Sequence, residues 1–286
     1  MDVTHDKVYV GRVKIAQEVL SNSPSARAKR EADSRFLYGH YTNIEGMLHI
    51  LQEREFLANR IDRVDDKEEA SYLQPLSEEQ ACMPYITCFD YKEDESIPLW
   101  CMYTKPETGV LLKFKIKESK TSFTFRQGFI DFDRKVKAFI SENKYVEYPF
   151  GTSREVFQYP VSVLTGMTDV VYNESVLSNS FVWINDERHL NLTALSGIKS
   201  KDWEFQHESR LVTTFQLSRS DGQEQEIDNY IYLKIPIHYG NLEILEITFS
   251  PWMGEKTKEV IKREVDMLNI PVEYKDSKYT GKISRK

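Results

Sequence analysis

The sequence predicts an α+β fold because two strand-rich parts enclose a middle with helical character. Runs of apolar and β-branched residues typical of strands occur at 36–116 and again after residue 196. The segment between them, at about 119–195, is less regular and suggests inserted helices. A chain of 286 residues can form one large domain or two small ones. Because the two strand-rich parts need a common core, we expect one domain at 36–286 after an appendage at 1–35.

The first half contains short strands and one helix with a recognisable start. Thr42 and Glu45 have the spacing of a capping box, in which each side chain satisfies a backbone N–H of the first helical turn. Apolar residues then recur at helical spacing, which predicts a helix with one buried face. We expect strands at 36–41, 55–59, 85–89 and 109–116.

The second half begins with a predicted helix at 129–145, marked by Ile130, Val136 and Ile140. We expect an extended segment at 145–150 and a helix with a loop at 169–190. Strands follow at 206–215, 230–235 and 242–249, and then a last helix at 255–268. Pro271 prevents that helix from continuing, and we expect the basic tail at 275–286 to be partly frayed.

Composition and charge argue against several classes of protein. The net charge of −7 gives no general attraction to nucleic acid or to anionic membranes. Neither an N-terminal signal peptide nor a run of about 20 apolar residues is present in the sequence. The cysteines Cys82, Cys88 and Cys101 match no zinc spacing, and we expect Cys88 and Cys101 to be small core residues. We therefore expect a cytoplasmic protein with reduced cysteines.

The residues with the most chemical promise are Gln206, Glu208 and Arg210. If 206–215 is a strand, these side chains share one face, about 6.5–7 Å apart. A carboxylate placed there can stabilise positive charge that develops on a bound sugar. The guanidinium of Arg210 would lower the pKa of Glu208 and keep it ionised. Upstream, His40 and the two residues after it offer an imidazole, an aromatic ring and a hydroxyl.

Each of these features also has a purely structural interpretation. Glu208 and Arg210 could form a solvated pair on an exposed strand, and His40 could be a core histidine. The aromatic cluster at 99–103 is typical of core, with one ring facing a cleft. The acidic run at 62–69 fits a solvated loop better than a metal site, although its oxygens suit Mg²⁺ or Ca²⁺.

Taken in order, the motifs resemble a large bacterial family of domains of unknown function, which looks like a branch of the ADP-ribosyltransferase fold. The resemblance covers about 36–277. Its implied fold is a pair of split antiparallel β-sheets with flanking and inserted helices. The motifs are Tyr38-Gly39-His40-Tyr41-Thr42, Asp65-Asp66-Lys67-Glu68, Leu99-Trp100-Cys101-Met102-Tyr103 and Lys199…Trp203…Gln206-His207-Glu208-Ser209-Arg210-Leu211.

That resemblance implies NAD as the substrate and Glu208 as the catalytic carboxylate, with Gln206 as its helper. His40 would fix the NAD riboses, and Trp100 or Tyr103 would stack on nicotinamide. The implied NAD-binding set is His40, Tyr41, Thr42, Asn59, Trp100, Tyr103 and Arg210.

The implied activity is mono-ADP-ribosyl transfer to a macromolecule, RNA or protein, by a toxin or anti-phage defence effector with an antitoxin-like inhibitor. For an RNA acceptor, we expect phosphate contacts from Lys199, Lys201, 27–35 and 275–286. Two alternatives remain open: a non-catalytic module that binds a nucleotide or a protein on the same fold, and an NAD hydrolase.

Overall fold

The computed structural model describes most of the two strand-rich parts of the chain. The predicted appendage at 1–35 lies outside the described residues, as does most of the segment at 169–190. The residues described are 36–66, 68–69, 84–116, 135–140, 145–149, 161–173, 196–217, 230–237 and 242–284.

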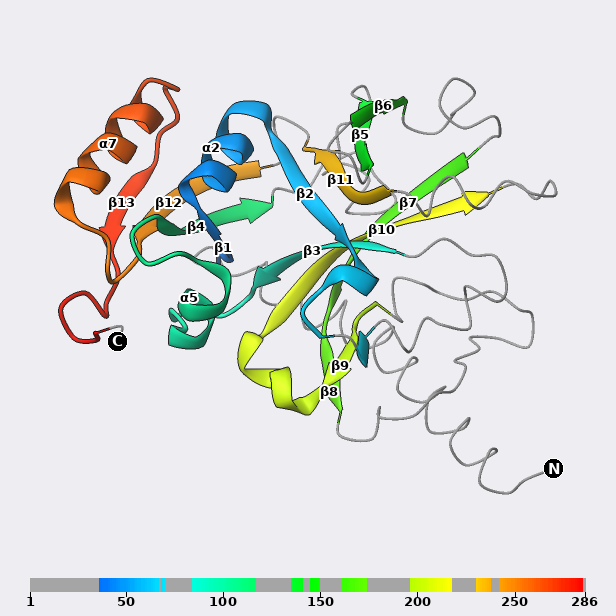
Figure 1. Cartoon of the computed structure of the whole chain (residues 1–286), viewed down its shortest axis with the longest axis horizontal. Helices are drawn as coiled ribbons and strands as arrows, with labels where there is room; N and C mark the ends of the chain where they lie inside the picture. Colours follow the sequence, from blue (N-terminus) through cyan, green and yellow to red (C-terminus); the bar gives the residue numbers. More distant parts are fainter. Residues whose placement is uncertain are drawn as a thin grey trace.

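A large mixed sheet dominates the described part of the chain, and few helices accompany it, as an α+β fold requires (Figure 1). Its 11 strands run in the order β13-β12-β4-β1-β3-β2-β11-β5-β6, and β10 joins β3 to β7. Their pairings are antiparallel except for the parallel pair β12–β13. The strands are β1 Tyr38–Asn43, β2 Glu55–Arg60, β3 Tyr85–Asp90, β4 Gly109–Ile116, β5 Lys135–Ile140, β6 Tyr145–Pro149, β7 Val161–Asp169, β10 Glu208–Leu217, β11 Tyr230–Pro236, β12 Leu242–Phe249 and β13 Glu273–Asp276.

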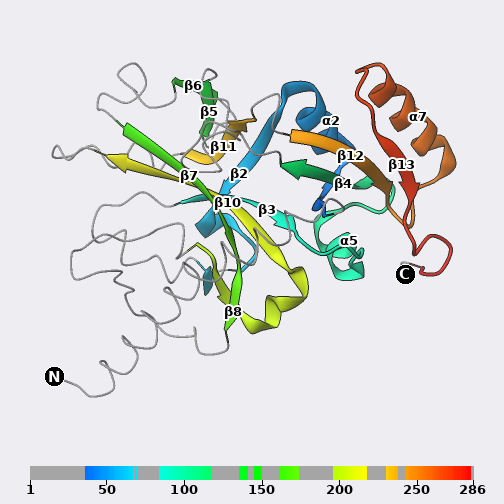
Figure 2. The same ribbon diagram turned by 180° about the vertical axis from the view of Figure 1, so that it is seen from behind.

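A second, two-stranded sheet and several helices complete the described elements. Strands β8 and β9 pair in parallel and lie beside β10 in both ribbon views (Figures 1 and 2). These elements are β8 Val171–Asn173, β9 Ile198–Ser200, the α-helices α2 Ile44–Glu53, α5 Ile97–Tyr103 and α7 Glu255–Asp266, and the 3-10 helices η1 Ile61–Arg63 and η2 Lys201–Gln206.

The sheet divides at β3, which has different neighbours along its two edges. One edge pairs with β10 over six residues, from Tyr85 to Asp90. On the other edge β2 pairs only with Tyr85 and Ile86, and β1 only with Asp90. Between these two pairings, side chains rather than backbone groups contact this edge of β3. His40 Nδ1 lies 3.0 Å from the carbonyl oxygen of Cys88, and the Thr87 hydroxyl donates to the carbonyl of Leu57 at 3.2 Å.

The main core lies where α2 and α7 cover strands of the sheet. Helix α2 buries Met47, Ile50 and Leu51, and α7 buries Ile261 and Val265. These side chains belong to one cluster with buried residues of β1, β2, β4 and β12. The apolar spacing that predicted both helices therefore marks the faces that pack on the sheet. No described helix is long and apolar enough to cross a membrane.

The predicted strands at 85–89, 109–116 and 242–249 are confirmed with their ends shifted by at most one residue, and the extended segment at 145–150 is confirmed as β6. The predicted helix at 129–145 is wrong over 135–140, which form strand β5 between β11 and β6. Charged and apolar residues alternate at its start, and pairing on both sides satisfies the backbone. Every described segment within the predicted helical insertion at 119–195 is a strand.

Two further local predictions are wrong. Thr42 and Glu45 form no capping box, because Thr42 belongs to β1 and the N-cap residue is Asn43, whose side chain accepts the N–H of Lys105 instead at 2.7 Å. The tail from 275 is not frayed at its start. Strand β13 pairs with β12, and Ser277 after it is buried.

Candidate functional site

A cavity of about 440 Å³ opens where the sheet divides at β3. This volume lies in the range of small-molecule sites. Strands β1, β2, β3 and β10 supply its walls, together with α5, η2 and the segment after η1. Its lining residues are Gly39, His40, Tyr41, Leu57, Asn59, Arg63, Val64, Asp65, Asp66, Ile86, Thr87, Cys88, Phe89, Asp90, Leu99, Met102, Tyr103, Lys199, Gln206, Glu208 and Arg210.

The start of β10 determines how the charged residues enter this cavity. Helix η2 ends at His207, whose φ of 43° is left-handed, and β10 begins at Glu208. The prediction that Gln206 lies on the same strand is therefore wrong. All the same, the turn at His207 leaves Gln206 lining the cavity beside Glu208 and Arg210. All three side chains are buried, with 3%, 5% and 1% of their residues' surface exposed.

Four buried charges form a closed network around Glu208. Arg210 donates to both carboxylate oxygens of Glu208, at 2.6 Å from Nε and 3.0 Å from Nη2. Its Nη1 reaches the carbonyl of Ser196 at 2.7 Å and a carboxylate oxygen of Glu69 at 2.6 Å. Lys199 Nζ lies 2.9 Å from Glu69 and 3.3 Å from Glu208. Two cations thus balance two carboxylates, which is what buried charges require.

The network keeps Glu208 ionised. Burial by itself raises the pKa of the Glu208 carboxyl, but the charges of Arg210 and Lys199 outweigh burial and lower it to about 2. The same attraction raises the pKa of Arg210 and of Lys199 against their own burial. At neutral pH, Glu208 is therefore a permanent anion at the cavity wall. The sequence predicted this effect from the position of Arg210 two residues after Glu208.

Two tyrosines position the residues that flank this carboxylate. The Tyr103 hydroxyl accepts the amide N–H of Gln206 at 2.7 Å, while Lys199 donates to the amide oxygen at 2.7 Å. The Tyr172 hydroxyl accepts the backbone N–H of Glu208 at 2.9 Å. Tyr103 remains 39% exposed, so its ring is available at the cavity wall. Gln206 is therefore fixed at both ends of its amide.

His40 is held as a neutral imidazole. Its Nδ1 faces the Cys88 carbonyl, which only accepts, so Nδ1 carries the proton and Nε2 keeps its lone pair. Burial lowers the pKa of His40, although the hydrogen bond to Cys88 opposes the shift. Edge-on contacts with Phe56 and Phe89, at 5.8 and 5.7 Å between ring centres, fix the ring.

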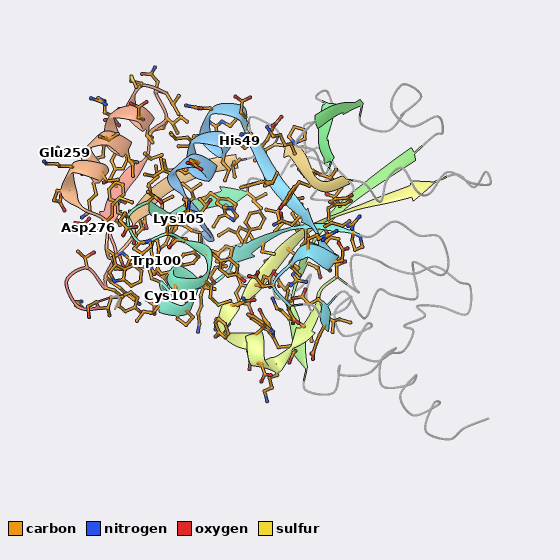
Figure 3. All side chains as sticks on the ribbon, in the orientation of Figure 1. His49, Trp100, Cys101, Lys105, Glu259 and Asp276 are labelled. Carbon is orange, nitrogen blue, oxygen red and sulfur yellow. The ribbon has the colours of Figure 1, made fainter. Side chains whose placement is uncertain are left out.

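Trp100 and Thr42 do not reach the cavity, in contrast to their predicted roles. Trp100 and Cys101 are neighbours on α5 (Figure 3), but Trp100 is completely buried and Cys101 is exposed. The Trp100 indole N–H donates to Glu95 at 3.0 Å, and its ring meets Tyr41 edge-on at 5.0 Å. Trp100 therefore packs in a small core and cannot stack on a ligand. The exposure of Cys101 also corrects the prediction that it is a core residue.

The other predicted binding residues, His40, Tyr41, Asn59, Tyr103 and Arg210, do line the cavity. The acidic run at 62–69 is not simply a solvated loop, because Asp66 and Glu69 are buried. No three His, Cys, Asp or Glu side chains in the described part of the chain form a group that could hold a metal ion. Lys199 is a member of the buried network and is only 5% exposed, so it is not a surface phosphate contact.

The residues that sequence reasoning missed include Arg63 and Asp90 in the cavity lining, Cys88 as a neighbour of Glu208, and Glu69 and Tyr172 beside it. Only the antiparallel register of β3 and β10, which places Asp90 opposite Glu208, could have indicated one of them. Comparison of the chain with models of protein families, with curated proteins and with solved structures gives no match.

Proposed function

We propose that this chain is an NAD-dependent mono-ADP-ribosyltransferase, which breaks the nicotinamide–ribose bond and transfers ADP-ribose to a macromolecule. The observation that carries the proposal is the position of Glu208, an ionised carboxylate in the wall of a cavity of about 440 Å³. A buried, permanently ionised carboxylate favours reactions in which positive charge develops on the substrate.

Cleavage of an N-glycosidic bond passes through an oxocarbenium-like transition state, as other glycoside cleavages do. The positive charge then spreads over the anomeric carbon and the ring oxygen of the ribose. In the proposed reaction Glu208 stabilises that charge and accepts a hydrogen bond from a ribose hydroxyl. Gln206, held by Lys199 and Tyr103, positions the sugar. Because Glu208 is such a weak base, its role is electrostatic.

The cavity wall also suits the positively charged nicotinamide ring of NAD. Tyr103 presents a ring that is 39% exposed, and an aromatic face attracts a flat cation. Asp66 lines the same cavity and is 8% exposed, and its Oδ2 has no hydrogen-bond partner among the described residues. Of the three cations in the lining, Arg63 alone has an exposed side chain (59%), and we assign it to the pyrophosphate.

The division of the sheet at β3 supports an ADP-ribosyltransferase-like arrangement, in which NAD binds between two parts of a split sheet. His40 on β1 and Glu208 on β10 approach the cavity from the two sides of β3. In this proposal His40 offers Nε2 as an acceptor to a ribose hydroxyl, and Tyr41 and Asn59 complete the wall. The proposed membership of that fold rests on this topology and on the resemblance in the sequence.

For the acceptor, the exposed residues near the cavity favour a protein over RNA. At the cavity and on η2, the exposed acidic residues Asp65, Asp202 and Glu204 outnumber the exposed cations Arg63 and Lys201, and this excess of negative charge disfavours a phosphate backbone. Lys199, which the sequence suggested as a phosphate contact, is buried beside Glu208. We retain the role of a toxin or defence effector, with an antitoxin-like protein as inhibitor, as part of the proposal.

A specific observation favours a second candidate, a nucleotide-binding module without catalysis. The carboxylate of Glu208 already accepts three hydrogen bonds, two from Arg210 and one from Lys199. A carboxylate offers about four such sites. In the enzyme, a ribose hydroxyl has to take the site that remains or compete with these donors, whereas a binding module needs no contact with Glu208.

The test is incubation of the purified protein with labelled NAD and a cell extract separated into protein and RNA fractions. We expect nicotinamide release and label in the protein fraction. Glu208→Asp keeps the charge balance of the network but withdraws the carboxylate, so we expect a loss of about 10²–10³-fold with the fold intact. Asp94→Asn, a change of an exposed carboxylate paired with Lys278, is the matched control and should retain full activity.

Binding of NAD with no nicotinamide release by any variant would select the binding module over the enzyme. Release of free ADP-ribose with no labelled macromolecule would identify a hydrolase. Label in the RNA fraction would contradict the preference for a protein acceptor.

A further inference from the structure

Asp90 is a second carboxylate in the lining of the cavity, and the register of the sheet pairs its position with that of Glu208. The two residues are paired in the antiparallel register of β3 and β10. Directly opposed residues of an antiparallel pair project to the same face, with Cβ atoms about 4.5–5.5 Å apart. Both side chains line the cavity, and Asp90 is only 7% exposed. A substrate bound against Glu208 therefore lies within reach of Asp90.

The two carboxylates have different partners. Glu208 is held by Arg210 and Lys199. Asp90 accepts one hydrogen bond, from the backbone N–H of Lys92 at 2.8 Å, and forms no ion pair with any described residue. A carboxylate that is buried without a cation beside it is a stronger base than one that is locked between two cations.

The neighbouring elements place few charges near Asp90. The chain just after β3 contributes Lys92, β4 contributes Lys113 at longer range, and Lys113 is itself paired with Glu246 at 3.4 Å. From β1, neutral His40 and Tyr41 share the cavity, and Glu208 of β10 lines it but is not among the charges that shift the pKa of Asp90. Burial raises the pKa of Asp90 to about 7, although Lys92 and Lys113 oppose the shift. Asp90 thus changes charge near neutral pH, whereas Glu208 does not.

Resting on the proposed function, we infer that Asp90 is the general base that accepts the proton of the attacking nucleophile. The bond between the anomeric carbon and the nicotinamide nitrogen breaks, and its electron pair leaves with neutral nicotinamide. The acceptor's O–H or N–H group forms the new bond to the anomeric carbon. Its proton passes to the Asp90 carboxylate and then to water. Glu208 stabilises the cation throughout, so each carboxylate has one task.

The decisive experiment compares water and azide as nucleophiles in wild type, Asp90→Asn and Glu208→Asp. Water has a proton that the base must remove, but the azide anion has none. We expect Asp90→Asn to lower turnover with water by about 10²–10⁴-fold. Azide should restore nicotinamide release and form ADP-ribosyl azide with this variant. Glu208→Asp lacks the positioned anion, so azide should not restore its activity.

The pH dependence gives an independent kinetic readout. A base must be ionised to act, so wild-type turnover with water should rise with pH around a midpoint near 7. Asp90→Asn should abolish that rise and leave KM for NAD nearly unchanged. Asp94→Asn changes an exposed carboxylate four positions after Asp90 and should keep the wild-type pH profile.

The pH dependence of protein stability tests the titration of Asp90 without any measurement of activity. Because the pKa of Asp90 is raised from 3.8 to about 7, the folded protein holds the Asp90 proton more tightly than the unfolded chain does. Its contribution to stability is fully present below about pH 4 and is lost as pH rises to about 7. In Asp90→Asn, the amide oxygen still accepts the backbone N–H of Lys92, but the side chain no longer loses stability as pH rises. Its Tm should therefore exceed that of wild type increasingly between pH 4 and 8.

The outcomes separate the two proposals. A wild-type protein that releases no nicotinamide overturns the proposed function itself. A wild type that cleaves NAD, beside an Asp90→Asn variant that keeps the same rate and the same rise with pH, overturns only the role of Asp90. A Tm difference that does not change with pH shows that Asp90 does not titrate near neutrality, and it also overturns that role.

Discussion

The network of four buried charges that includes Glu208 meets two requirements that conflict for a single residue. A carboxylate that stabilises a cation must be ionised and shielded from water, but burial by itself favours its neutral form. Arg210 and Lys199 resolve this conflict for Glu208, and Glu69 in turn balances their second charge. The cost is that no member can be removed alone without leaving a buried charge behind.

A double-mutant cycle tests this balance. Arg210→Met should destabilise the fold by roughly 3–5 kcal/mol, because Glu69 and Glu208 then share only Lys199. Adding Glu208→Gln removes one of the two uncompensated buried negative charges of the broken network, so the double variant should lose less than the sum of the single ones by about 1–3 kcal/mol. Urea denaturation measures all four free energies of unfolding.

Arg263→Met is the matched control for that cycle. Arg263 is 70% exposed and lies 3.6 Å from Glu264 on α7. Its loss should cost about 1 kcal/mol or less. Additive effects at Arg210 and Glu208 would contradict a coupled network and would make the ion pairs independent of each other.

At the site, the sequence predicted residues whose neighbours are local and missed those brought in from a distance. Glu208 and Arg210 are two apart in one strand, so their pairing follows from the period of a strand. Glu69 and Lys199 are 130 positions apart, and no local pattern connects them. Trp100 resembled a ligand-stacking ring, but its neighbours Glu95 and Tyr41 make it core.

At the scale of elements, α5 connects β3 to β4 and carries Leu99, Met102 and Tyr103 to the cavity. It is a short helix, so its position depends on how its ends are fixed. At its C-terminal end the Thr104 hydroxyl donates to the carbonyl of Trp100 at 2.6 Å. The chain then returns tightly to Gly109, the first residue of β4.

Gly109→Ala tests this return. A Cβ at position 109 would lie 2.7 Å from the Thr104 Cβ and 2.8 Å from the carbonyl oxygen of Lys105. The second contact is with backbone, which cannot rotate away, so we expect a destabilisation of about 1–3 kcal/mol. Gly254→Ala is the control, because a Cβ there meets nothing within 4 Å and φ is −77°. A thermal melt in which the two variants have the same Tm would refute the steric argument.

The elements also show where sequence patterns are sufficient. Strand β12 was predicted with its observed ends, because its run of apolar and β-favouring residues is typical of a strand. Strand β5 was mistaken for a helix, since a short apolar pattern fits both periods and the deciding partners, β11 and β6, lie elsewhere in the sequence. The division of the sheet at β3 has no sequence signal, because it depends on where β1 and β2 stop pairing.

At the scale of the whole molecule, the C-terminal segment fixes the helix that borders the cavity. Glu95, just before α5, accepts the N–H of Trp100 at 3.0 Å, the Ser277 hydroxyl at 2.5 Å and the backbone N–H of Lys278 at 2.9 Å. The Tyr279 hydroxyl donates to the Glu95 carbonyl at 3.2 Å. Residues more than 180 positions apart thus meet at one carboxylate.

Glu95→Ala should weaken the attachment of both α5 and the C-terminal segment, because both donate hydrogen bonds to the Glu95 carboxylate. The buried indole N–H of Trp100 loses its acceptor, which costs about 1–3 kcal/mol. The segments at 97–103 and 277–279 should then exchange their amide hydrogens faster, and hydrogen exchange followed by mass spectrometry measures both at once. Ser277→Ala removes one contact and should affect mainly 277–279. If 97–103 stayed protected in Glu95→Ala, α5 would be held by its own packing, and the C-terminal segment would have no influence on the cavity wall.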